Sequence, residues 1–128
     1  MARDIKVAEE QAEAEFIDWL EGMDIDPDTE GDKARVVKAI MHGDLVFNDD
    51  GLAVYTPWRS ASGYREPLVF HERTGADLMA ADAKAKLGPL RQMYATMGSL
   101  CRADASVFSK LSGADIKTCE AIFGFLMA

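Results

Sequence analysis

Apolar residues near the start of the chain recur with the spacing of an α-helix in two segments. Residues 8–21 are rich in Ala and Glu, which favour helices, and residues 32–42 follow a polar loop that contains Pro27 and Gly31. The two apolar stripes are Phe16, Ile17, Leu20 and Met23, and then Val36, Val37, Ile40 and Met41. The pattern predicts two helices, each with one buried side, and Gly43 is suited to end the second one.

A β-hairpin is predicted directly after the second helix. Residues 44–47 and 52–56 are short apolar segments on either side of the turn sequence at 48–51, which ends in Asp-Gly. Asp-Gly favours the positive φ angles of a tight turn. Pro57 then ends the second strand or places it at a sheet edge. Residues 59–66, which contain two serines and Gly63, are expected to form a loop.

The rest of the chain predicts short helices separated by capping residues. Thr74 with Asp77 has the form of a capping box before a helix over residues 75–86, and Gly88-Pro89 ends that helix and opens the next. Asp104 is expected to cap a short helix, and Ser112, with Asp115 three residues further on, is expected to cap the last one. The apolar positions of the three later helices are Leu90, Met93, Tyr94, Met97 and Leu100, then Val107, Phe108 and Leu111, and finally Ile116, Cys119, Ile122, Phe123 and Leu126.

These elements predict an α+β fold that is mostly helical, with two N-terminal helices, one β-hairpin and a C-terminal bundle of short helices. At 128 residues the chain is expected to be a single domain. Within it we distinguish an acidic helix-helix-hairpin part over residues 1–58, the loop at 59–66, and a helical part over 67–128. No apolar run is long enough to predict a membrane span, and acidic residues near the N-terminus leave no visible signal peptide.

Charge is distributed unevenly along the chain, which has a net charge of −8. Residues 1–50 contain 15 Asp and Glu against 5 Lys and Arg, whereas residues 51–128 contain 7 against 9. An acidic first half disfavours contact with a phosphate backbone. It is interpreted as a solvated helical surface, with two alternatives left open: a surface for a basic partner, and a mimic of DNA.

A calcium site is not predicted, although the acidic loop at residues 24–28 invites comparison with an EF-hand. An EF-hand loop beginning at Asp24 requires glycine at its sixth position and a bidentate glutamate at its twelfth. Thr29 and Arg35 occupy these two positions. We therefore interpret the segment as a solvated acidic loop.

No catalytic, cofactor or other metal site is predicted either, and the chain is expected not to be an enzyme. His42 and His71 are far apart in the sequence, and Cys101 and Cys119 do not have the spacing of metal ligands. The sequence around Ser99 does not match a nucleophile elbow, and there is no phosphate-binding glycine loop. Without a secretory signal, the two cysteines are expected to be buried thiols.

The last residues of the chain are unusually apolar. Because Phe123, Phe125 and Met127 cannot all face one core from a single helix, we expect part of this helix to bind a partner or a second subunit. The alternative is a C-terminal helix that packs entirely into its own domain. The predicted partner-binding residues are Tyr94, Met97, Ile122, Phe123, Phe125, Leu126 and Met127.

Residues 44–128 resemble the tail assembly chaperones of long-tailed bacteriophages, the Mu-like type in particular. The resemblance follows the Asp50-Gly51 turn, the extended segment ending in Arg65-Glu66-Pro67, and the helices that open near Asp77 and around residue 90. It continues through Leu111-Ser112-Gly113-Ala114-Asp115 to the final helix. The acidic segment that precedes the hairpin departs from the pattern, because members of the family usually begin close to the hairpin.

The resemblance implies a non-enzymatic protein of the bacterial host cytoplasm that coats the tape measure protein during tail assembly and helps to recruit tail tube subunits. From the charge and the lack of a long apolar run, no contact with nucleic acid or membrane is expected, and a homo-oligomer is left open. A small DNA-linked regulator, either an acidic inhibitor or a helix-turn-helix repressor, is the alternative. The last helix offers only Lys117, Thr118 and Glu120 for base contacts before it becomes apolar, which disfavours the repressor.

Overall fold

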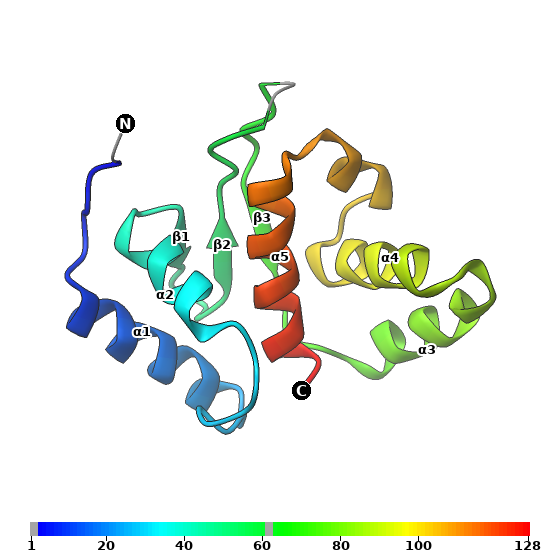
Figure 1. Ribbon diagram of the computed structural model, residues 1–128. Coiled ribbons are helices and arrows are strands. Elements are labelled where there is room, and N and C mark those ends of the chain that lie inside the picture. Colours follow the sequence, from blue (N-terminus) through cyan, green and yellow to red (C-terminus); the bar gives the residue numbers. More distant parts are fainter. Residues whose placement is uncertain (1–2, 61–62) are drawn as a thin grey trace.

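A computed structural model describes residues 3–60 and 63–128, and shows an α+β fold that is mostly helical, as predicted (Figure 1). Its regular elements are α1 (Glu9–Gly22), α2 (Lys33–Met41), β1 (Leu45–Phe47), β2 (Ala53–Tyr55), β3 (Leu68–Phe70), α3 (Gly75–Ala83), the 3₁₀-helix η1 (Ala85–Leu87), α4 (Pro89–Cys101), the 3₁₀-helix η2 (Ala105–Lys110) and α5 (Gly113–Leu126). Of the loop predicted over 59–66, residues 61–62 lie outside the described part.

The sheet has three antiparallel strands in the order β1-β2-β3, one more than the predicted hairpin. β2 pairs with β1 through Val54 and Val46, and with β3 through Val54 and Val69. The third strand was not predicted because only three residues after Pro67 form it, and the extended conformation of the segment does not reveal that it pairs with β2.

The predicted capping residues hold the helices of the second half in place. Thr74 and Asp77 form a complete capping box at the start of α3, and the Ser112 hydroxyl accepts a hydrogen bond from the backbone N–H of Asp115 at the start of α5. Asp104 accepts from the backbone of η2, and Pro89 occupies the first turn of α4. The helix predicted over 75–86 ends earlier, at Ala83, and continues as η1.

Helix α5 lies at the centre of the molecule, with α1 and α2 on one side and α3 and α4 on the other (Figure 1). Its Phe125 ring meets the Phe16 ring of α1 edge-on, with 5.0 Å between the ring centroids. The loop between α1 and α2 lies over the same ring, since a Cβ atom added at Gly31 would stand 2.6 Å from it. The buried apolar residues of the acidic part and of the helical part thus form one core.

No helix in the described part of the chain has both the length and the apolar character needed to cross a membrane.

Candidate functional site

Four of the seven predicted partner-binding residues lie inside the core. Met97, Ile122 and Phe125 are fully buried, and Leu126 is nearly so. Their side chains are occupied by contacts within the protein, so in this fold they offer no surface to a partner. The central position of α5 explains this burial, because a helix covered on several sides can direct apolar side chains in several directions.

The other three predicted residues, Tyr94, Phe123 and Met127, are partly buried against the same core. The Tyr94 ring stacks on the buried Phe108 ring, with 6.0 Å between centroids. The carbonyl oxygen of Met127 accepts a hydrogen bond from Arg73 at 3.1 Å. All three side chains are thus held partly inside the protein, and partner binding through them stays a prediction.

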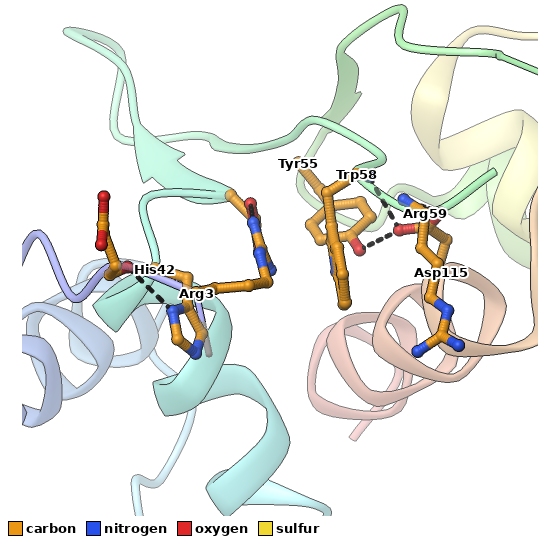
Figure 2. Close-up of polar contacts among 8 residues, drawn as sticks. Arg3, His42, Tyr55, Trp58, Arg59 and Asp115 are labelled. Atoms are coloured by element: carbon orange, nitrogen blue, oxygen red, sulfur yellow. Dashed lines mark hydrogen bonds and ion pairs between the residues drawn. The ribbon is translucent and has the colours of Figure 1, made fainter. Parts of the chain in front are cut away.

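A buried carboxylate, Asp115, connects α5 to the segment that follows β2 (Figure 2). One of its oxygens accepts hydrogen bonds from the Tyr55 hydroxyl at 2.6 Å and from the Trp58 backbone N–H at 3.1 Å. The other accepts from the Arg59 backbone N–H at 3.1 Å and from the Ser60 hydroxyl at 3.0 Å. The Ser112 hydroxyl is within reach of this second oxygen, at 3.1 Å. Both oxygens are therefore fully engaged inside the protein.

These contacts set the ionisation of the pair formed by Asp115 and Tyr55. Burial alone would raise the pKa of Asp115, but the hydrogen bonds from Tyr55 and the neighbouring backbone favour the charged form and lower the pKa below its usual value. Burial and the bond to Asp115 raise the pKa of Tyr55. Asp115 is thus a charged group and Tyr55 a neutral donor at neutral pH, and their role is structural.

Asp77 has a similar role at the start of α3, where its side chain is also buried. It accepts hydrogen bonds from the backbone and hydroxyl of Thr74, and from the Ser99 hydroxyl of α4. Arg102 lies 4.0 Å away as a partly exposed countercharge. Burial opposes the charged form, and the bonds from Ser99 and Thr74 overcome this effect and lower the pKa of Asp77. This carboxylate fixes α3 to α4.

Four of the six large apolar side chains that are exposed in the described part of the chain lie on α3, α4 and η1 between them, here called the α3–α4 arm. Its exposed large side chains are Leu78, Met79, Leu87 and Leu90, and Met79 is 75% exposed. Asp77 is the only buried residue of α3, so this helix contributes no apolar side chain to the buried core. An exposed set of aliphatic residues on one arm is typical of a binding surface.

A hollow of about 480 Å³ lies on the opposite part of the molecule, beside α2, and is here called the α2 hollow. It is lined by residues of the N-terminal segment, α2, the segment after β2 and the first turns of α5: Arg3, Ile5, Arg35, Lys38, Ala39, His42, Asp44, Trp58, Ala114 and Thr118. Arg3 forms an ion pair with Asp44 and lies 3.7 Å from the centroid of the Trp58 ring. Figure 2 shows Arg3 extending from beside His42 toward Trp58.

The cysteines are placed as expected, as two free buried thiols. Burial raises the pKa of Cys101 to about 12, and it also raises the pKa of Cys119. Both side chains are therefore protonated and unreactive at neutral pH. In the described part of the chain, no three side chains of His, Cys, Asp or Glu are grouped as metal ligands.

Sequence reasoning missed the exposed aliphatic residues of the arm and the basic lining of the hollow. Both had a signal in the sequence. Leu78 and Met79 directly follow Asp77, the residue that completes the predicted capping box. In the second helix, Arg35, Lys38 and His42 recur at spacings of three and four. That spacing places the three side chains on one side of α2.

Comparison of the chain with models of protein families, with curated proteins and with solved structures finds no match.

Proposed function

We propose that this chain is a non-enzymatic tail assembly chaperone of a bacteriophage or prophage. In this role it binds the tape measure protein in the cytoplasm of the bacterial host and helps to bring tail tube subunits to it. The observation that carries the proposal is the α3–α4 arm, which exposes Leu78, Met79, Leu87 and Leu90 while α3 supports the core with a single buried residue. A surface of this kind can cover apolar side chains of a partner before assembly.

The arm favours an amphipathic helix with acidic flanks as the bound segment. Its exposed charged residues are Asp82, Lys84, Lys86 and Arg91, which together leave an excess of positive charge around the aliphatic side chains. A partner helix would place its apolar stripe on the leucines and its acidic residues near the lysines. A tape measure protein is a long helical protein, so it suits this mode of recognition. The sequence analysis expected the contact surface on α5, together with Tyr94 and Met97 of α4. This mechanism moves it to the exposed side chains of α3, η1 and α4.

The proposal assigns structural roles to the buried carboxylates. Asp115 and Asp77 have the burial that often marks catalytic groups, but internal hydrogen-bond donors occupy both oxygens of each side chain. A carboxylate held in this way has no free lone pair directed at a substrate.

Co-expression with the tape measure protein encoded in the same gene neighbourhood tests the proposal. We expect the natural chain to keep that protein soluble, and the double variant Leu78→Ser/Leu90→Ser to lose the effect while remaining folded, since both side chains are exposed. Val46→Ser is the matched control, because Val46 is 50% exposed on β1, away from the arm. The proposal fails if the tape measure protein is equally insoluble with and without this chain. Salt-sensitive binding to operator DNA in a mobility-shift assay would instead favour a regulator.

A further inference from the structure

The lining of the α2 hollow has a charge opposite to that of the surrounding chain. Of the 15 acidic residues among positions 1–50, Asp44 alone lines the hollow, whereas three of the five basic residues do. Arg3, Arg35 and Lys38 contribute three positive charges to the lining and Asp44 one negative charge, which gives the lining a net charge of about +2 without counting His42. Asp32, which lies outside the lining, pairs with Arg35. Arg35 and Lys38 lie three positions apart on one side of α2, where like charges repel each other, and Asp32 offsets only the charge of Arg35.

The α2 side of the hollow carries hydrogen-bond donors that the protein itself does not use. The Nε of Arg35 donates to Asp32 at 3.2 Å, which leaves its terminal nitrogens for another acceptor. Within the described residues, the side chain of Lys38 has no hydrogen bond or ion pair. The Nδ1–H of His42 donates to the carbonyl oxygen of Asp4 at 3.0 Å, so the Nε2 atom of the neutral ring faces a ligand as an acceptor and not as a donor.

The remaining walls are shaped for an organic group. Ala39 and Ala114 are small side chains that leave the space open, and Trp58 and Ile5 present apolar surface at the rim. Arg3 covers the Trp58 ring and is held there by Asp44, so this wall is already ordered without a ligand. The volume of about 480 Å³ is that of a site for a small molecule.

We propose that the α2 hollow binds a small phosphate monoester that carries a planar or apolar organic group. A phosphate dianion matches the net charge of the lining, and Arg35 and Lys38 supply donors to it from one side of α2, with the His42 ring beside them. The organic group would lie against Ile5 and the part of Trp58 that Arg3 does not cover. A nucleic acid strand is disfavoured, because the hollow holds one anionic group and the first half of the chain repels a long polyanion. This inference does not depend on the chaperone proposal.

Calorimetric titration of the natural chain with phenyl phosphate tests the inference. NMR of the His42 ring signals during the same titration shows whether the ligand lies beside this ring. We expect saturable binding with a shift of the His42 ring signals. Lys38→Gln and Arg35→Gln should each weaken the affinity about tenfold or more, because a hydrogen bond to a charged group is worth about 1.5–3 kcal/mol. Lys33→Gln is the matched control: Lys33 lies on the same helix, is similarly exposed and does not line the hollow. Its affinity should equal that of the natural chain.

Three results would overturn the inference. The first is no saturable binding of phenyl phosphate at millimolar concentration. The second is an equal loss of affinity in Lys33→Gln, which would indicate general attraction to surface charge. The third is equal or tighter binding of benzoate or of a DNA duplex, which would remove the preference for a phosphate monoester. The variant with both Arg35→Gln and Lys38→Gln should still keep the tape measure protein soluble, so that failure here and failure of the chaperone proposal can be distinguished.

Discussion

Replacing Asp115 with asparagine should strongly lower the free energy of unfolding of this protein. The carboxylate accepts from five donors, of which the Tyr55 hydroxyl and the Trp58 backbone share one oxygen. An amide in the same place offers one oxygen and turns an NH₂ group toward donors that then lack an acceptor. A hydrogen bond to a charged group contributes about 1.5–3 kcal/mol, and at least two are lost. We therefore expect a decrease of about 3–5 kcal/mol, close to the cost of breaking a buried charged pair.

Urea unfolding at pH 7, followed by circular dichroism, measures this change. Tyr55→Phe removes a single donor and should destabilise by about 1–2 kcal/mol. A double-mutant cycle of Tyr55→Phe with Asp115→Asn should show a coupling of about 1 kcal/mol or more, because the two side chains bond directly. Asp82→Asn, at an exposed position of α3, is the control and should change stability by less than about 0.5 kcal/mol.

The pH dependence provides a second measure of the same group. Because the pKa of Asp115 is lower in the folded protein than in the unfolded chain, its stabilising effect is complete above the unfolded pKa of about 3.9 and is lost as the pH falls through the folded pKa. The stability difference between the natural chain and Asp115→Asn should therefore narrow below about pH 4. A loss under 1 kcal/mol at pH 7, or a difference that stays constant on acidification, would refute the proposed role of these hydrogen bonds.

Three further predictions concern the core and the helices. Gly98→Ala should destabilise by about 1–3 kcal/mol, because its Cβ would stand 2.8 Å from a backbone carbonyl oxygen, whereas Gly124→Ala, with open space around it, should be neutral or stabilising in thermal unfolding. Phe125→Ala should cost about 3–5 kcal/mol in urea unfolding, and a near-neutral result would contradict its place in the core. Cys101 and Cys119 should resist a thiol reagent at pH 8 until urea is added, and rapid labelling of the folded protein would show that they are accessible.

Features that depend on neighbouring residues were predictable from the sequence. Thr74 and Asp77 form the expected capping box, and Ser112 begins the last helix, because caps depend on residues three positions apart. Asp115 was recognised only as part of that local cap. Its bonds to Tyr55 and Trp58 join segments that are distant in sequence, and no local pattern reports them.

The apolar character of the last helix was read correctly, and the structure accounts for much of it by burial inside the protein, whereas partner binding through this helix stays a prediction. Phe123, Phe125 and Met127 do point in different directions, as their spacing requires, yet the sequence could not show that other elements surround α5 on several sides. The third strand was missed for a related reason. Leu68–Phe70 is defined by its pairing with β2, and pairing between distant segments cannot be read from three residues alone.

The contact between Gly31 and the ring of Phe125 has a consequence for the order of events during synthesis. The loop that joins α1 to α2 leaves the ribosome before the ring that it covers, because Phe125 follows Gly31 by 94 positions. Until that ring arrives, Phe16 lacks its edge-on neighbour and the apolar sides of α1 and α2 remain open to water. The acidic residues of the nascent first half would then limit its association with other chains, since like charges repel.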